Sequence, residues 1–314
     1  MKRLLVHVGY PKAASTTLQN ALFLGLHERG SIHFLGRAFE SDFCGFANDK
    51  QEFKKWLSTV SPNERKPHRY DALNPDHLPD IFSQMSGQKV NLLSEGAFIL
   101  NDRAGESFVV PRRIYDYFHG NVDSLEVMLV IRSQTTLIMS NYVQRYRNIE
   151  EKKFKKYLEV HMNGEKKDSG DFKIYNIYNV AKSYIEVFGR NNFHILFFED
   201  MMNDSASFVN EVGKMLDVDS FDVDHCLSKG SFNVTKNKSD YHICKKPFKR
   251  SFRYRFGKLL RKVHVEPGEL MKTKVPKMTS EEEQRIFDYF KDSNLRLAEE
   301  FSLNTEKMQA YRYL

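Results

Sequence analysis

One segment near the amino terminus decides the fold, and it reads His7-Val8-Gly9-Tyr10-Pro11-Lys12-Ala13-Ala14-Ser15-Thr16-Thr17-Leu18-Gln19. An apolar run at residues 4–8 predicts a buried strand, residues 9–14 a turn, and residues 15–26 a helix with apolar residues on one face. Amide groups at the start of a helix have no partner within it, and the helix dipole adds positive charge there. The segment therefore predicts an anion-binding site, with Lys12 supplying a cation at its mouth.

The position of Lys12 distinguishes this loop from the phosphate-binding loop of kinases and ATPases. That loop carries Gly-Lys-Ser/Thr, with the lysine opening the helix, whereas Lys12 comes three residues before Ser15. No acidic residue stands out in the sequence as a magnesium ligand. A P-loop-like nucleotide kinase therefore stays an alternative, which magnesium-dependent consumption of ATP would support.

Further apolar runs predict buried strands at residues 90–93, 125–131 and 193–198. Helical patterns separate them, and the clearest covers residues 175–188. Short apolar strands that alternate with helices indicate a central, mostly parallel sheet with helices on both faces. We therefore expect a P-loop-like, three-layer α/β/α fold in a single domain over residues 1–314.

Two other parts of the chain stand out along this domain. The polar, proline-containing stretch at about 37–89 is expected to be an insertion over the edge of the sheet. Near the carboxyl end, Ser280-Glu281-Glu282-Glu283 has the form of a capping box. It predicts the start of a helix whose apolar residues fall on one face.

A second candidate anchor for an anion follows the strand predicted at 125–131. Arg132 leaves the end of this strand, and Ser140 comes eight residues later on the next predicted helix. Open α/β sheets bind ligands at the carboxyl ends of their strands. The planar guanidinium group suits a phosphate better than an ammonium group does, so Arg132 and Ser140 are candidate phosphate ligands.

Both motifs resemble those of sulfotransferases that use 3′-phosphoadenosine 5′-phosphosulfate (PAPS), most closely the bacterial carbohydrate sulfotransferases. Pro11-Lys12-Ala13-Ala14-Ser15-Thr16-Thr17-Leu18 is similar to the family's 5′-phosphosulfate loop, usually Pro-Lys-x-Gly-Ser/Thr-Thr, and residues 132–142 resemble its 3′-phosphate motif. The resemblance implies PAPS as cofactor, 3′-phosphoadenosine 5′-phosphate (PAP) as product, and no metal. The cofactor-binding residues that it implies are Lys12, Ala13, Ala14, Ser15, Thr16, Thr17, Arg132 and Ser140.

The resemblance also assigns catalytic roles. Lys12 becomes the cation that stabilises charge on the bridging oxygen of the donor, and Glu95, at the end of the second strand, becomes the candidate base. His7 is the rival base because it immediately precedes the loop, although a histidine in a strand is more often a core residue. The loop departs from the family at Ala14, where glycine is usual. If this position needs a positive φ, alanine costs about 1 kcal/mol or more.

The acceptor is expected to be a hydroxyl group on a glycan or glycolipid. The formal net charge of +7 suits an anionic partner. Residues 245–262 carry nine Lys or Arg and no acid. Three interpretations stay open for this basic segment: a solvated amphipathic helix, peripheral contact with an anionic membrane, or contact with an acidic acceptor.

Other signals in the sequence are weaker. The apolar run at the amino terminus is too short for a signal peptide, and the scattered residues Cys44, Cys226 and Cys244 indicate neither a zinc site nor a disulfide framework. We therefore expect a cytoplasmic protein, with a peripheral position on the inner face of the membrane as an alternative.

A nucleic-acid-binding module using the basic segment is a further alternative, but no reader motif accompanies it, so no nucleic-acid partner is expected.

Overall fold

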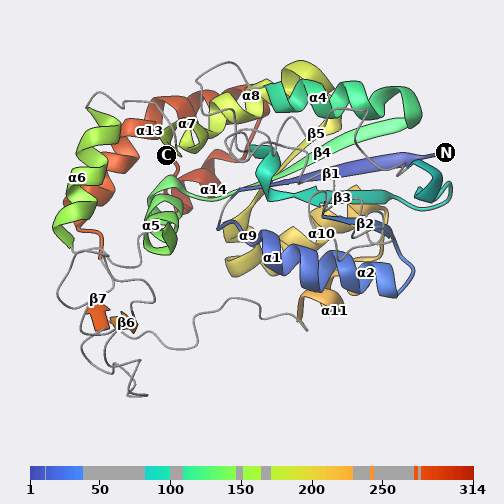
Figure 1. The fold of residues 1–314 in the computed structure, drawn as a ribbon, viewed down its shortest axis with the longest axis horizontal. Helices are drawn as coiled ribbons and strands as arrows, with labels where there is room; N and C mark the ends of the chain where they lie inside the picture. Colours follow the sequence, from blue (N-terminus) through green and yellow to red (C-terminus); the bar gives the residue numbers. More distant parts are fainter. Residues whose placement is uncertain are drawn as a thin grey trace, which may run out of the picture.

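The computed structural model describes residues 1–10, 12–37, 82–99, 109–145, 151–163, 171–228, 241–243, 272–274 and 277–314 (Figure 1). Most of the predicted insertion at about 37–89 and the whole basic segment 245–262 lie outside these residues, as does Pro11. The predictions made for them stay predictions.

A five-stranded, fully parallel sheet with the order β2-β3-β1-β4-β5 forms the centre of the molecule. Four strands match the predicted apolar runs. The strand β2 was not predicted, because its sequence His-Phe-Leu-Gly-Arg carries only two adjacent apolar residues. The strands are β1 (Arg3–Gly9), β2 (His33–Arg37), β3 (Asn91–Glu95), β4 (Ser124–Ile131) and β5 (Phe193–Phe197).

Strand β1 is central and almost wholly buried, which explains why it reads as one apolar run. Its neighbours β3 and β4 run in the same direction, with Val8 in register with Glu95 and with Leu129. The carboxyl ends of these three strands therefore meet at one edge of the sheet. This edge receives the loop that follows Gly9 and the turn that contains Arg132.

Helices cover both faces of the sheet, as predicted for a three-layer α/β/α fold. In Figure 1, α4, α8 and α13 lie above the strands, and α1, α2, α10 and α11 lie below them. The helices of the two layers and their flanks are α1 (Ser15–Thr17), α2 (Leu24–Glu28), α4 (Val109–Phe118), α5 (Gln134–Arg145), α6 (Glu151–Met162), α7 (Asp171–Tyr175), α8 (Ile177–Phe188), α9 (Phe198–Asn203), α10 (Ser205–Leu216), α11 (Ser220–Ser228), α13 (Ser280–Phe301) and α14 (Thr305–Ala310).

Short elements complete the described part of the chain. They are the 3₁₀ turns η5 (Phe82–Gln84), η6 (Gly96–Ile99), η7 (His119–Asn121) and η8 (Arg190–Asn192), and the antiparallel pair β6 (Tyr241–Ile243) and β7 (Lys272–Lys274). In these described residues, no helix is long and apolar enough to cross a membrane. Cys226 is buried.

Two predicted helices differ in detail from the structure. The helix predicted over residues 15–26 is interrupted after α1 by the π-helical stretch η1 (Leu18–Phe23) before α2 continues it. The capping box of α13 uses Thr279 rather than Ser280. The Thr279 hydroxyl accepts from the Glu282 amide at 3.2 Å, and the Glu282 carboxylate accepts from the Thr279 amide at 2.9 Å. The box therefore begins one residue earlier than predicted, where both reciprocal bonds can form.

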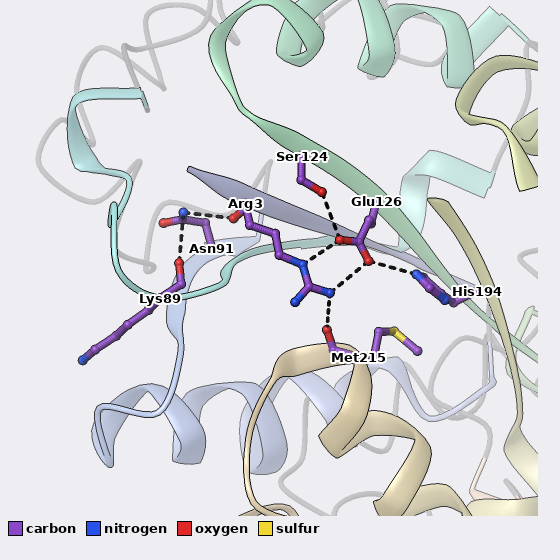
Figure 2. A network of polar contacts seen from close by, with 7 residues as sticks. All are labelled: Arg3, Lys89, Asn91, Ser124, Glu126, His194 and Met215. Atoms are coloured by element: carbon purple, nitrogen blue, oxygen red, sulfur yellow. Dashed lines mark hydrogen bonds and ion pairs between the residues drawn. The ribbon is translucent and has the colours of Figure 1, made fainter. Parts of the chain in front are cut away.

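The opposite edge of the sheet, at the amino ends of the strands, holds a polar network around Glu126 (Figure 2). Its carboxylate accepts from Arg3 at 2.6 and 3.0 Å, from the Ser124 hydroxyl at 3.1 Å, and lies 3.0 Å from His194 Nε2. The second guanidinium nitrogen of Arg3 also donates to the carbonyl of Met215 at 2.7 Å. The network thereby ties β1, β4, β5 and α10 together, far from the edge that carries the candidate site.

Candidate functional site

The loop after β1 turns sharply because two of its residues have left-handed backbone. Lys12 has φ 67° and Ala14 has φ 60°, although neither is glycine. The Ala13 amide donates to the Tyr10 carbonyl at 3.2 Å, and the Ser15 hydroxyl lies 3.4 Å from the same oxygen. These contacts close the turn, so the helix starts directly above the end of β1.

Ala14 occupies the N-cap position of this helix and offers no side-chain oxygen to its first turn. A left-handed residue followed by a helical one makes the concave arrangement of backbone amides that binds anions. The structure answers the question left open by the sequence, because the φ of Ala14 is positive. Alanine carries the steric cost of about 1–2 kcal/mol of the left-handed conformation, which strained sites retain where function requires it.

The other predicted residues of the loop lie along the first turn of the helix. Ala13 is buried, Ser15 and Thr17 are half-buried, and Thr16 is exposed. The side chain of Lys12 is exposed. The loop therefore presents an ammonium group and hydroxyl groups at the carboxyl edge of the sheet, while the Ala13 side chain below them is buried.

Arg132 lies beside this loop, as its position after β4 requires. Its Nη1 donates to the carbonyl oxygen of Lys12 at 2.7 Å, its Nε donates to the Thr136 hydroxyl at 3.0 Å, and its guanidinium carbon lies 4.5 Å from the centre of the Phe198 ring. These contacts hold the guanidinium plane between the loop and α9. The two anchors expected from the sequence are thus brought together.

Ser140 lies on α5, one turn beyond Thr136. Residues four apart share one face of a helix, so Ser140 continues the face whose Thr136 hydroxyl already contacts Arg132. The side chain of Ser140 is half-buried. Its neighbour Asn141 is buried and donates to the Tyr175 hydroxyl at 2.8 Å, which anchors this part of α5 against α7.

The partly buried carboxylate of Glu199, whose partner Ser133 directly follows Arg132, was not among the predicted site residues. Glu199 accepts from the Ser133 amide at 2.9 Å and from the Tyr313 hydroxyl at 3.0 Å. Burial raises the pKa of Glu199, against the opposing effects of these two hydrogen bonds and of Arg132. Burial likewise lowers the pKa of Arg132, which Glu199 opposes. The sequence offered only one signal for Glu199, its place at the end of β5.

The two candidate bases differ in their surroundings. Glu95 ends β3, in register with Val8 and therefore level with the start of the loop; the direction of its carboxylate stays a prediction. His7 is fully buried, 5.3 Å from the Phe23 ring, and its Nδ1 lies 2.7 Å from the Ser94 hydroxyl. Burial lowers the pKa of His7 to about 3, so His7 is a neutral residue of the core.

Within the described residues, no group of three or more His, Cys, Asp or Glu side chains is arranged to bind a metal ion. Two cationic residues, Lys12 and Arg132, instead follow the carboxyl ends of β1 and β4, and Glu199 is bonded to the residue after Arg132. The site is therefore suited to an anionic ligand.

Comparison with known families identifies the domain. A model described as "Sulfotransferase domain" matches residues 3–294, which is most of the chain. The chain belongs to the sulfotransferase domain family. Among proteins with curated annotation, no sequence matches this sulfotransferase significantly.

One solved structure agrees with this assignment at the level of the fold. The sulfotransferase from Alicyclobacillus acidocaldarius has a TM-score of 0.52 and 12% identity, with 99% of each chain covered. The sulfotransferase domain of the Synechococcus PCC 7002 olefin synthase has a TM-score of 0.36 and 11% identity, covering 69% of this chain and 73% of that one. At these identities the first match supports a shared fold and nothing finer about this sulfotransferase.

Proposed function

We propose that this sulfotransferase moves a sulfuryl group from PAPS to a hydroxyl group of a carbohydrate acceptor, on a polysaccharide, glycolipid or oligosaccharide. The observation that carries the proposal is the 2.7 Å contact between Arg132 and the Lys12 carbonyl, which joins the two candidate phosphate anchors at neighbouring strand ends. A donor with phosphate groups at two positions needs two such anchors at one edge of the sheet. When bound, PAPS supplies the activated sulfuryl group.

The residues of the chain fit this donor by their chemistry. The amides from Ala14 to Thr17 and the Lys12 ammonium would hold the 5′-phosphosulfate, and the Lys12 charge would stabilise the bridging oxygen as negative charge grows there. Arg132 and Ser140 would hold the 3′-phosphate. A guanidinium group has five N–H donors, and the contacts to Lys12 and Thr136 use two nitrogens, Nη1 and Nε.

Glu95 is the residue that we propose as general base. A base must lie close to the acceptor hydroxyl to take its proton, and Glu95 ends β3 beside the loop. The burial of His7 and the lowering of its pKa support Glu95 over this rival, because a core histidine does not reach an acceptor.

A titration that compares related nucleotides tests the donor class directly. We expect PAP to raise the melting temperature more than AMP or ATP does, because only PAP has both the 5′- and the 3′-phosphate, and ligand binding to the folded state raises stability. If ATP with magnesium stabilised the protein more than PAP does, the kinase alternative would replace this proposal.

The acceptor needs a separate experiment. Transfer of a radiolabelled sulfuryl group from PAPS to neutral and acidic polysaccharides, glycolipids and a small phenol would define its class. We expect label on a carbohydrate acceptor. Label on the phenol alone would contradict the carbohydrate assignment while leaving the sulfotransferase activity in place.

The role of the basic segment 245–262 can be tested with lipid vesicles. Sedimentation with vesicles that contain anionic lipid, compared with neutral vesicles, separates the membrane interpretation from the other two, because polybasic segments bind anionic surfaces. If the protein does not sediment with the anionic vesicles, peripheral membrane contact through this segment is ruled out. Binding of an acidic polysaccharide acceptor is then measured next.

A further inference from the structure

Glu199 lies between the Arg132 turn and the segment at residues 311–314. One of its carboxylate oxygens accepts from the Ser133 amide at 2.9 Å, and the other accepts from the Tyr313 hydroxyl at 3.0 Å. Ser133 directly follows Arg132, and Phe198, whose ring lies under the Arg132 guanidinium, directly precedes Glu199. The partly buried Glu199 side chain therefore connects Tyr313 to the residue after Arg132, and its sequence neighbour Phe198 contacts the guanidinium.

Tyr313 is held rigidly enough to position this carboxylate. Its side chain is fully buried, with its ring centre 5.5 Å from that of Phe197. The Asn294 amide donates to the Tyr313 carbonyl at 2.9 Å, and Asn294 also pairs with Gln134 at the start of α5 at 2.8 and 3.1 Å. The hydroxyl is thus fixed relative to the helix that begins beside Arg132.

The Arg132 turn has a further contact with the same segment. The Ser133 hydroxyl lies 3.4 Å from the Arg312 carbonyl and 3.1 Å from the Thr135 hydroxyl. Burial of Glu199 without such donors would favour its neutral form, since desolvation penalises the charge. The hydroxyl of Tyr313 and the amide of Ser133 therefore help to keep a negative charge behind the guanidinium.

We propose that Tyr313 acts through Glu199 as a positioning residue for Arg132, and thereby sets the affinity of the site for the 3′-phosphate of the nucleotide. This inference rests on the proposed function, because it assigns the 3′-phosphate to Arg132. Tyr313 itself does not touch the ligand in this scheme. It fixes the backbone and the electrostatic surroundings from which the guanidinium projects.

The chain contains a matched control two residues away, at Tyr311. The Tyr311 hydroxyl donates to Asp200 at 2.7 Å, and Asp200 follows Glu199 in sequence. The other donor to Asp200 is Lys307, at 3.1 Å, which also donates to the Ser207 hydroxyl at 3.0 Å. This second tyrosine–carboxylate pair thus connects α9 to α14 and α10, and in the described part of the chain its hydrogen bonds do not involve Arg132 or Ser133.

The experiment measures the dissociation constants of PAP and AMP by calorimetry for the wild type, Tyr313→Phe and Tyr311→Phe. The ratio of the two constants isolates the 3′-phosphate, which AMP lacks. We expect Tyr313→Phe to weaken PAP binding about threefold to tenfold, the effect of losing one hydrogen bond, with AMP binding little changed. Tyr311→Phe should preserve the ratio. Melting curves show whether each variant is folded.

The outcomes separate the two proposals. If the wild type prefers PAP and Tyr313→Phe keeps the full preference, the positioning role is overturned and the proposed function stands. A wild type that binds PAP no better than AMP overturns both. A ratio lowered equally by Tyr311→Phe also overturns the positioning role, because the loss would then be general. Should Tyr313→Phe not fold, Glu199→Gln gives the same comparison, and an unchanged ratio in that variant has the same meaning.

Discussion

The guanidinium group of Arg132 donates a hydrogen bond to the backbone carbonyl of Lys12 at 2.7 Å. The two residues are 120 positions apart in the chain. They meet because β1 and β4 are adjacent parallel strands, with Gly9 in register with Val130. This contact holds the Arg132 side chain against the backbone of the Lys12 loop.

Replacing Lys12 by alanine should reduce turnover of PAPS about 100- to 1000-fold, the usual cost of removing one group that stabilises charge in the transition state. The fold should be unaffected, because the side chain is exposed. Steady-state kinetics with saturating PAPS measure the effect. The control is Lys182→Ala on α8, an exposed lysine 4.0 Å from Glu186. Turnover at the wild-type rate in Lys12→Ala would reject the assignment of Lys12.

Replacing Arg132 by lysine keeps the charge but removes the planar fork, whereas alanine removes both. We expect Arg132→Ala to weaken PAP binding by about 10- to 100-fold, the range for hydrogen bonds to charged groups, and Arg132→Lys to fall between it and the wild type. Binding of AMP should change little, which calorimetry can measure. Arg112→Ala, which removes an exposed arginine 3.7 Å from Asp116, is the control. Equal losses for PAP and AMP would place Arg132 elsewhere than at the 3′-phosphate.

Replacing Glu95 by glutamine should slow turnover about 100- to 10,000-fold, the contribution typical of a general base. The affinity for PAP should be retained. Rapid-quench kinetics and calorimetry separate the two quantities, with Glu186→Gln as a surface control. A collapse of PAP affinity in Glu95→Gln would instead make Glu95 a structural or cofactor-binding residue.

Replacing Ala14 by glycine should leave stability unchanged or raise it by up to about 1 kcal/mol. Glycine adopts a positive φ without steric cost, but it loses more conformational entropy than alanine when the chain folds. The control is Ala181→Gly inside α8, where φ is helical and the side chain is buried. This variant should lose about 1 kcal/mol or more. Urea unfolding measures both. A destabilisation of Ala14→Gly as large as that of Ala181→Gly would contradict the strain argument.

The Glu126 network predicts a pH dependence of stability. Burial alone would raise the pKa of Glu126, but hydrogen bonds from His194 and Arg3 lower it to about 2 in the folded protein, below its usual value of 4.5. A depressed folded pKa contributes stability that is present above pH 4.5 and is lost as the pH falls through 2. Glu126→Gln should therefore cost about 1–3 kcal/mol at neutral pH and less in acid.

This prediction is tested by urea unfolding of the wild type and Glu126→Gln. The measurements are made at pH 7 and at the lowest pH at which both proteins are still folded. An exposed substitution, Glu186→Gln, should show no comparable pH dependence. The same loss for Glu126→Gln at both pH values would mean that shape and packing, rather than the charge of Glu126, stabilise this edge of the sheet.

Local patterns in the chain were sufficient for much of the fold. The apolar runs at β1, β3, β4 and β5 identify parallel strands, because strands buried on both faces need apolar side chains at consecutive positions. The loop around Lys12 and the arginine after β4 could likewise be predicted, since each depends on its place at the end of a strand. Strand β2 escaped prediction because residues outside its short sequence stabilise it through pairing with β3.

The tertiary structure alone decided three features of the site. It places Arg132 against the Lys12 carbonyl, it buries His7 in the core, and it inserts Glu199 between Ser133 and Tyr313. Each depends on contacts between residues far apart in the chain, and no local pattern encodes which distant side chain will fill a given space. Short-range preferences determined which residues follow the strand ends, and long-range packing determined which groups surround the side chains of those residues.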